Sequence, residues 1–399
     1  MRFSANVASL TPSATLALAA RARQMREEGL RVVDLSAGEP TFGTPDFAAQ
    51  AGITAIRAGR TGYPPTRGIP ELRSAIVRYL QETTAHAAED DSGVLVSAGV
   101  KQALFNAIFC LFGPGDEVLV PAPYWPSYPA LIELAGARPV IVPTAWEHEF
   151  RLDVELLERS RTARTRGLII NSPGNPTGVV YDLDRLRRIA AWCAQHGVWL
   201  LSDEIYRRLH YGSGPAPSIY DVEDRPEHVL LLDGVSKAFC MTGWRIGFAV
   251  GPPELVARAT DLQSQTTSGA AAPSQYAAAM ALGDAGAREA AIRSNLSRLR
   301  RNRRLGCDLL SNLDALEVRA PAGAIYLFVR LGQGSGTEED TPETTSLAVA
   351  ERLLQEAGVA GIPGEPFGSP GYLRFNFAVS EDQVEDGFRR VRNFFEAAT

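Results

Sequence analysis

The segment that carries the clearest chemistry is an apolar run that ends in a turn of small residues with one amine. This turn contains Ser236 and Lys237, and Arg245 follows eight residues after the lysine among glycines. A lysine amine can condense with a carbonyl cofactor to a Schiff base, while a hydroxyl and a guanidinium bind a phosphate dianion. Because most lysines are solvated surface residues, the segment becomes informative only together with its partners upstream.

Two further apolar runs end in polar residues. One is followed by a Pro/Gly-rich loop that contains Asn175, and the other ends in Asp203, with Tyr206 three residues later. In an open α/β sheet, functional groups gather where strands end and loops begin. Three consecutive strands are therefore predicted to bring these residues and Lys237 to one rim of a sheet.

The residue types at this rim suit a pyridine ring that acts as an electron sink. Such a ring needs a protonated nitrogen, so a carboxylate such as Asp203 must face it. A phenolic ring oxygen needs donors, which Asn175 and Tyr206 supply, and these donors lower the proton affinity of the Schiff base. Each residue also has an ordinary structural explanation, as a turn asparagine, a helix-capping aspartate or a core tyrosine. Their ordered combination favours a shared site.

Ten different short motifs are distributed along nearly the whole chain. In order they are Pro12–Thr15, Ala37–Pro40, Gly62–Tyr63, Gly68–Arg73, Gly99–Leu104, Pro121–Trp125, Asn171–Gly178, Ser202–Tyr206, Ser236–Phe239 and Leu373–Ala378. With these motifs the chain resembles the class I, fold-type I pyridoxal-phosphate aminotransferases, in the prokaryotic aspartate-aminotransferase-like branch (subgroup Ib). The resemblance implies pyridoxal 5′-phosphate as cofactor, ping-pong transfer between an amino acid and a 2-oxo acid, and a homodimer with a shared active site.

The resemblance also implies roles for the residues around the cofactor ring. Lys237 would bond the cofactor and move the proton between the substrate Cα and the cofactor. Asp203 would pair with the ring nitrogen, and Asn175 and Tyr206 would donate to the ring oxygen. Trp125 would stack on the ring face, where its large π-surface positions the cofactor.

The cofactor phosphate would be bound by several segments, one of them from the partner subunit. The implied residues are Gly99, Val100, Lys101, Ser236, Arg245 and, across the interface, Tyr63. The first three open a helix, and backbone amides at a helix N-terminus bind anions. Val100 stands where relatives commonly have glycine, but a backbone amide serves from either residue.

The substrate would be bound at the opposite end of the site. The implied substrate-binding residues are Gly38, Trp125, Asn175, Arg374, Thr15 and Lys101. Arg374 would hold the α-carboxylate bidentately, which a lysine could not imitate. Thr15 and Lys101 match positions that help bind the distal carboxylate in aspartate-using relatives. An acidic amino acid, most simply aspartate, is the expected donor, and 2-oxoglutarate is the expected acceptor.

Other functions stay open at this point. The same scaffold supports β- or γ-elimination or replacement, or a step like that of 1-aminocyclopropane-1-carboxylate synthase. A non-catalytic sensor module of a transcription regulator is a more distant alternative. Such regulators carry a long N-terminal winged helix, whereas here the resemblance begins within the first dozen residues. A panel of donors and acceptors would separate these cases.

The elements that must position the site alternate along the chain. The predicted strands are Val94–Ser97, Val118–Val120, Arg138–Val142, Leu168–Asn171, Trp199–Asp203, Val229–Leu232 and Ile246–Val250. The predicted helices are Glu71–Gln81, Gln102–Phe112, Tyr128–Ala135, Leu183–His196 and Pro273–Leu282. This alternation predicts an α/β fold with a mostly parallel sheet wrapped by helices. The resemblance implies seven strands.

A chain of 399 residues exceeds what one core usually supports, so two domains are expected. Residues 47–285 would form the large cofactor-binding domain, and residues 1–46 with 286–399 a smaller α+β domain. The later elements predicted are a long arginine-rich helix, the strands Ala324–Val329 and Tyr372–Ala378, and the helices Ser346–Ala357 and Ser380–Phe395. Arg374 and Lys237 would then lie on different bodies, so that substrate binding could close the cleft.

Composition excludes several partners. A formal net charge of −6 argues against nucleic acid or an anionic membrane surface as a partner.

The four cysteines are scattered without metal-ligand spacing, so no metal site is expected. No signal segment or membrane span is recognised, which favours the cytoplasm. The Gly/Ser-rich segment 333–345 is expected to be a flexible excursion rather than a nucleotide-binding loop.

Overall fold

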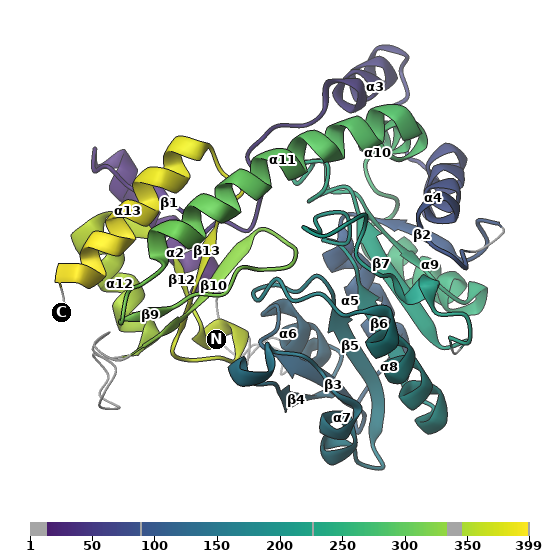
Figure 1. The fold of residues 1–399 in the computed structure, drawn as a ribbon. Coiled ribbons are helices and arrows are strands. Elements are labelled where there is room, and N and C mark those ends of the chain that lie inside the picture. The colour runs from purple at the N-terminus through teal and green to yellow at the C-terminus, as the bar shows by residue number, and fades with distance from the viewer. Residues whose placement is uncertain (1–13, 88–89, 226, 333–344, 398–399) are drawn as a thin grey trace, which may run out of the picture.

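A seven-stranded sheet forms the centre of the computed structural model, which describes residues 14–87, 90–225, 227–332 and 345–397 (Figure 1). The strands lie in the order β2-β8-β7-β6-β5-β3-β4. Their bounds are β2 Val94–Ser97, β3 Glu117–Ala122, β4 Arg138–Pro143, β5 Thr165–Asn171, β6 Trp199–Asp203, β7 Val229–Gly234 and β8 Gly247–Val250. Of these seven strands, β8 alone runs opposite to the other six, so the predicted mostly parallel sheet is confirmed.

The apolar runs of the sequence explain this sheet. Every residue of β2 and of β7 is buried. Parallel strands covered by helices on their faces carry nearly continuous apolar residues. Strands of this kind are therefore visible in the sequence as short runs of valine, leucine and isoleucine.

Helices surround the sheet. Their bounds are α3 Asp46–Arg57, α4 Pro70–Thr83, α5 Val100–Leu111, α6 Ser127–Leu134, α7 Val154–Ser160, α8 Leu183–His196, α9 Pro253–Thr266 and α10 Ala272–Gly283. The predicted bounds of α8 are confirmed. They could be predicted because residues at both ends of the helix mark its start and its end. The Asp182 side chain accepts a hydrogen bond from the Arg185 backbone amide at 2.7 Å, and Gly197 ends the helix at φ 63°.

A second group of elements lies beside the large sheet (Figure 1). It contains α2 Ala14–Glu27, α12 Ser346–Ala357, α13 Glu381–Ala397 and a sheet in the order β12-β13-β10-β9, with β9 Leu316–Glu317, β10 Tyr326–Leu331, β12 Ile362–Pro363 and β13 Tyr372–Asn376. The long helix α11 (Ala285–Leu310) runs from the α10 region to α13 and connects the two groups.

The N-terminal and C-terminal parts of the chain meet in this second group. Strand β1 (Val33–Asp34) pairs in parallel with β11 (Val359–Ala360). The short strands β1, β9, β11 and β12 were not predicted, because two residues carry no periodicity. The expected excursion at 333–345 lies outside the described residues, apart from Thr345, whose side chain caps α12.

Two kinds of feature are absent from the described part of the chain, namely membrane-spanning helices and clusters of metal-binding side chains. No helix within it combines the length and the apolar character needed to cross a lipid bilayer. No group of His, Cys, Asp or Glu within it could hold a metal ion.

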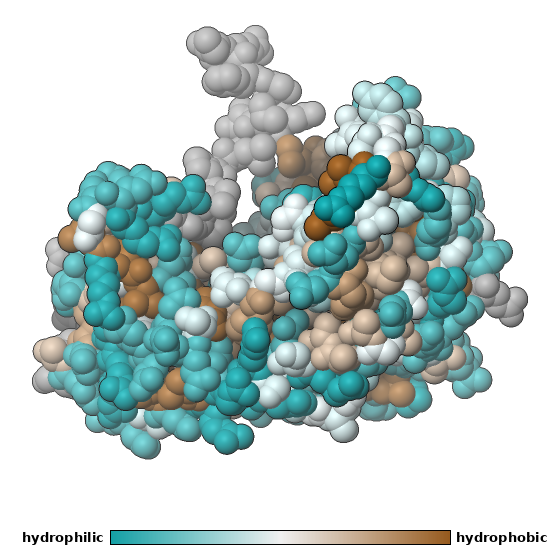
Figure 2. Space-filling model, turned by 90° about the horizontal axis from the view of Figure 1, so that it is seen from above, coloured by the Kyte–Doolittle hydropathy of each residue, from teal (hydrophilic) through white to brown (hydrophobic). Residues whose placement is uncertain are grey.

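On the face drawn in Figure 2, hydrophobic patches interrupt a mostly hydrophilic surface. The exposed hydrophobic side chains of the molecule include Ile53 and Ile56 of α3 and Met280 of α10.

Candidate active site

Three neighbouring parallel strands end at one edge of the large sheet. Strand β6 pairs with β5 on one side and with β7 on the other. Asn175, Asp203 with Tyr206, and Lys237 therefore lie at the carboxyl ends of adjacent strands, as the sequence predicts. The loop after β5 is held against β6, because Asn171 donates to the Asp203 carbonyl at 2.8 Å and accepts from the Asn175 amide at 2.8 Å.

A cavity of about 1180 Å³ opens at this edge. Its walls come from α2, α5, α6, the strand ends and β10 and β13 of the smaller sheet. The predicted site residues that line it are Gly38, Val100, Lys101, Trp125, Asn175, Asp203, Tyr206, Ser236, Lys237, Arg245 and Arg374. The structure thus brings together residues that lie far apart in the sequence.

Lys237 is half-buried in the cavity wall. Its amine donates to the Gly38 backbone carbonyl at 2.6 Å. Loss of water around the amine lowers the Lys237 pKa to about 8, and the positive charge of Arg374 acts in the same direction. A substantial fraction of this amine is therefore neutral near physiological pH, as a nucleophile or a base requires.

Asp203 is buried, with 2 % of its surface exposed. Its carboxylate accepts from the Tyr128 hydroxyl at 2.7 Å and from the Ile205 backbone amide at 3.2 Å. Burial raises the Asp203 pKa to about 6, and the two hydrogen bonds oppose that rise. Such a carboxylate is suited to hold a proton that it shares with a basic partner in the cavity.

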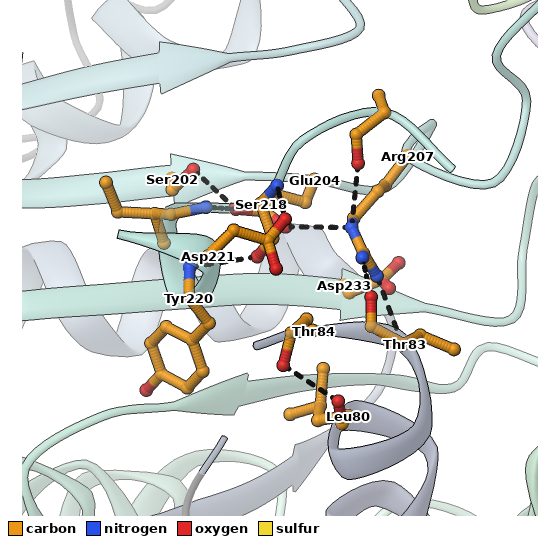
Figure 3. Close-up of polar contacts among 12 residues, drawn as sticks. Leu80, Thr83, Thr84, Ser202, Glu204, Arg207, Ser218, Tyr220, Asp221 and Asp233 are labelled. Carbon is orange, nitrogen blue, oxygen red and sulfur yellow. Dashed lines mark hydrogen bonds and ion pairs between the residues drawn. The ribbon is translucent and has the colours of Figure 1, made fainter. Parts of the chain in front are cut away.

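The turn after β6 is anchored by polar contacts of Glu204 and Arg207 (Figure 3). Glu204 accepts from the Ser202 hydroxyl at 3.0 Å and from the Ile219 amide at 2.8 Å. Arg207 donates to the Ala216 carbonyl at 3.1 Å and lies 3.8 Å from Glu204. Both charged side chains are buried and do not line the cavity, whereas Asp203, Ile205 and Tyr206 of the same turn do.

One end of the cavity is rich in groups that bind anions. Gly99 precedes α5 at φ 86°, and a Cβ there would lie 2.5 Å from Nη2 of Arg245. Arg245 donates to the carbonyls of Thr242 at 3.0 Å and Ala98 at 3.3 Å. The start of α5 and the guanidinium therefore lie close together in a cavity that Ser236 also lines, where a phosphate could bind.

Lys101 adds a further cation to the cavity. Its ammonium lies 5.0 Å from the ring centroid of Trp125. Burial, together with the charge of Arg245, lowers the Lys101 pKa. Trp125 in turn contacts Tyr128 edge-on, with 5.5 Å between the ring centroids.

Arg374 of β13 is the cation at the other end. Its guanidinium donates to Asn175 Oδ1 at 3.1 Å and to the Ser36 carbonyl at 2.7 Å. It lies 4.3 Å from the ring centroid of Tyr326 and 5.0 Å from that of Phe367. Its buried Nε has no hydrogen-bond partner among the described residues. An anionic ligand would supply one.

Three predicted residues stand apart from this arrangement. Tyr63 is fully exposed, so its side chain does not contact the cavity of its own chain. Thr15 lies in α2, but its side chain lies outside the described part of the structure. Gly99 is not among the residues that line the cavity and contributes through the start of α5.

Two tyrosines of the site were missed in the sequence. Tyr128, which bonds Asp203, lies in the first turn of α6 and follows Trp125 by three residues, and its backbone amide donates to the Trp125 carbonyl at 3.0 Å. Tyr326 resembles an ordinary core aromatic of a strand, yet its hydroxyl lies 2.7 Å from that of Tyr206. The spacing of Tyr128 could have been noticed, but no local pattern marks Tyr326.

Comparisons with known proteins agree with this geometry. A family model described as Aminotransferase class I and II matches residues 31–391. A probable aspartate/prephenate aminotransferase of Thermus aquaticus is 40% identical over 389 residues, which cover 97% of each chain. An aspartate aminotransferase of Geobacillus stearothermophilus is 37% identical over 398 residues, with 100% of both chains covered. The solved structure of an aspartate aminotransferase from Thermus thermophilus with maleate has a TM-score of 0.91 at 38% identity and covers 98% of this chain and 100% of that chain.

Proposed function

Because the chain belongs to the class I and II aminotransferase family, we propose that it uses pyridoxal 5′-phosphate to move the amino group of an acidic L-amino acid to a 2-oxo acid. Aspartate is the simplest donor and 2-oxoglutarate the simplest acceptor. The observation that carries the proposal is the placement of Lys237, Asp203 and Arg374 on the walls of one cavity. A nucleophilic amine, a buried carboxylate and a carboxylate-binding guanidinium suit cofactor-assisted chemistry at the Cα of an amino acid, and the aminotransferase relatives favour amino-group transfer over elimination.

The cavity fits the cofactor at its anion-binding end. A Cβ on Gly247 would lie 2.4 Å from the Val100 backbone nitrogen, and one on Gly99 would meet Arg245. Glycine at both positions lets the α5 amides approach that guanidinium closely enough to share one phosphate. When bound, pyridoxal phosphate supplies an aldehyde that takes up the amino group and a ring that accepts electrons from the bond broken at the substrate Cα.

Each residue around the ring position has a distinct task in this proposal. Lys237 would hold the cofactor through its aldehyde, and its amine would accept the proton of the substrate Cα and pass it on to the cofactor. Asp203 keeps a proton on the ring nitrogen. Asn175 and Tyr206 donate to the ring oxygen, and Asn175 is free to do so because only its Oδ1 is engaged by Arg374. Trp125 covers the ring face.

Arg374 is assigned to the substrate α-carboxylate. Its side chain is already held by Asn175, Ser36 and two aromatic rings, so little rotational freedom is lost on binding. The unpartnered Nε supports a bidentate carboxylate. Gly38 lies close by through the carbonyl that accepts from Lys237.

The preference for an acidic substrate rests on a second cation. Lys101 forms no ion pair with any acidic side chain of the described residues, and its ammonium loses hydration in the cavity wall, which favours a ligand carboxylate near it. Thr15 is proposed to assist it from α2. The names of the Thermus aquaticus and Geobacillus stearothermophilus relatives, which refer to aspartate, support the same donor.

A donor–acceptor panel tests this function. Purified protein loaded with pyridoxal phosphate is incubated with L-aspartate and each of several 2-oxo acids, and new amino acids are quantified. We expect one mole of glutamate per mole of aspartate consumed when 2-oxoglutarate is the acceptor. Release of ammonia without a new amino acid would instead indicate elimination. Lys237→Ala is the control, and borohydride reduction followed by peptide mapping should label Lys237.

A further inference from the structure

We propose that Tyr326 is a positioning residue that joins the two ends of the site, a role that rests on the function proposed above. Its hydroxyl would direct the Tyr206 hydroxyl toward the cofactor, and its ring face would hold the Arg374 guanidinium for the substrate carboxylate. Tyr326 belongs to β10 of the smaller sheet, whereas Tyr206 follows β6 of the large one. One side chain thus touches both a cofactor-binding and a substrate-binding residue.

The contact between the two tyrosines is close and buried. Their hydroxyl oxygens are 2.7 Å apart, and their rings meet edge to face with 5.8 Å between centroids. Tyr326 is 1 % exposed and Tyr206 is 3 % exposed. Burial raises the pKa of both tyrosines, so both hydroxyls keep their protons near neutral pH. In such a pair one hydroxyl donates and the other accepts.

The direction of donation follows from the cofactor. If Tyr206 donates its proton to the ring oxygen, it cannot also donate to Tyr326. Tyr326 must then donate to Tyr206, which gives a chain of hydroxyls that ends at the ring oxygen. Successive hydrogen bonds polarise one another, so Tyr326 makes Tyr206 a stronger donor.

The ring of Tyr326 acts on Arg374 in a different way. The guanidinium carbon lies 4.3 Å from the ring centroid, within the range of a cation–π contact. This contact orients the guanidinium without consuming its N–H donors. The unpartnered Nε of Arg374 therefore stays available for a carboxylate oxygen.

Tyr326→Phe isolates the hydroxyl, because phenylalanine keeps the ring face. A stronger donor at the ring oxygen lowers the proton affinity of the Lys237 nitrogen that is bonded to the cofactor. The variant should therefore raise the pH midpoint of the absorption change of the cofactor-loaded protein by roughly half a unit to one unit. Tyr211→Phe is the matched control. It removes a hydroxyl that donates to the Ala324 carbonyl at 2.6 Å beside β10, and it should leave the midpoint unchanged.

A double variant tests whether the effect passes through Tyr206. In a Tyr206→Phe background, adding Tyr326→Phe should produce no further change of the midpoint. An additional shift equal to that of the single variant would overturn the proposed chain. So would an unchanged midpoint in Tyr326→Phe when the wild-type protein titrates normally.

Carboxylate binding tests the ring face. Isothermal titration of the cofactor-loaded protein with maleate, which has no amino or oxo group to react, reports on Arg374. Tyr326→Phe should keep the maleate dissociation constant within about threefold, whereas Tyr326→Leu should raise it roughly tenfold. Equal affinity in both variants would refute the ring's role. Failure of the wild-type protein to bind cofactor or to transfer amino groups would refute the proposed function instead, so the two failures are distinguishable.

Discussion

At the scale of single residues, the site depends on titrating groups that are removed from water. Lys237 and Asp203 are shifted in opposite directions for the same reason, because burial disfavours the charged form of each. The amine becomes easier to deprotonate and the carboxyl harder to ionise. The two groups are thereby suited to a base and to a proton-sharing partner.

The shifted Lys237 pKa predicts how the rate of cofactor attachment depends on pH. The neutral amine is the nucleophile, and with a pKa of about 8 its neutral fraction rises about tenfold from pH 6 to pH 7 and levels off above about pH 9. The rate of covalent attachment to cofactor-free protein should follow this curve, as measured by absorbance after rapid mixing across pH 6 to 10. A rate that keeps rising to pH 10 would mean that the amine behaves as an ordinary lysine, and Lys237→Ala should show no covalent phase.

At the scale of elements, backbone geometry places the functional groups. The start of α5 and the turn after β6 both depend on residues that never touch substrate. Gly99 allows Arg245 to approach the helix end, and the buried pair of Glu204 and Arg207 holds the turn that carries Tyr206. Residues outside the cavity lining thus determine where Arg245 and Tyr206 lie on the cavity wall.

Gly99→Ala tests the phosphate end. An added methyl group would collide with Arg245, and its φ of 86° is unfavourable for alanine, so the anion-binding groups should move apart. We expect affinity for pyridoxal phosphate to fall roughly 10- to 100-fold, the equivalent of one charge-assisted hydrogen bond. Affinity for pyridoxal, which lacks the phosphate, should change little. The matched variant Gly113→Ala has open space around the new methyl group, and a comparable loss there would contradict the explanation.

Arg207→Leu tests the anchored turn. Arg207 and Glu204 have side chains that are 3% and 1% exposed, so removing the arginine leaves a buried carboxylate without its cation. The free energy of unfolding in urea should fall by about 3 kcal/mol or more. The exposed helix pair of Arg389 and Glu385, with 64% and 45% exposure, offers a control in which Arg389→Leu should cost less than about 1 kcal/mol. Equal losses of unfolding free energy in the two variants would show that the buried pair stabilises the protein no more than an exposed pair does.

At the scale of the whole molecule, the active site joins segments from both ends of the chain. We propose that residues 47–285 form one body and that residues 1–46 and 286–399 form the other, because β1 pairs with β11 and Arg374 faces Lys237 across the cavity. Binding of a carboxylate would then draw the bodies together and exclude water. Unchanged small-angle scattering and hydrogen exchange on adding maleate would argue against this closure.

The exposure of Tyr63 predicts a shared active site. We propose a homodimer in which this side chain reaches the phosphate of the partner subunit, because within its own chain it is fully exposed. Mixing inactive Tyr63→Arg and Lys237→Ala proteins, with exchange of subunits, should restore activity above either parent. In the hybrid, the site that keeps Lys237 receives an intact Tyr63 from the other chain. Absence of any recovery, with hybrid formation verified by mass, would place Tyr63 outside the site.

Local sequence was enough to predict the large sheet and the polar residues at the ends of three of its strands. Apolar runs mark β2 and β6, and side-chain and glycine caps mark both ends of α8, because these features depend on residues close together in the chain. Asp203 and Lys237 could be predicted because parallel strands present their carboxyl ends at one edge. Arg374, Trp125 and the segment Gly99–Lys101 were predicted only through the family resemblance.

Tertiary structure alone decided the contacts between distant segments. The bonds from Tyr128 to Asp203, from Tyr326 to Tyr206 and from Lys237 to the Gly38 carbonyl join residues 75, 120 and 199 positions apart. The pairing of β1 with β11 and the antiparallel direction of β8 were equally invisible. Sequence periodicity reports which side of an element is buried, whereas the partner it meets depends on how all the elements pack together.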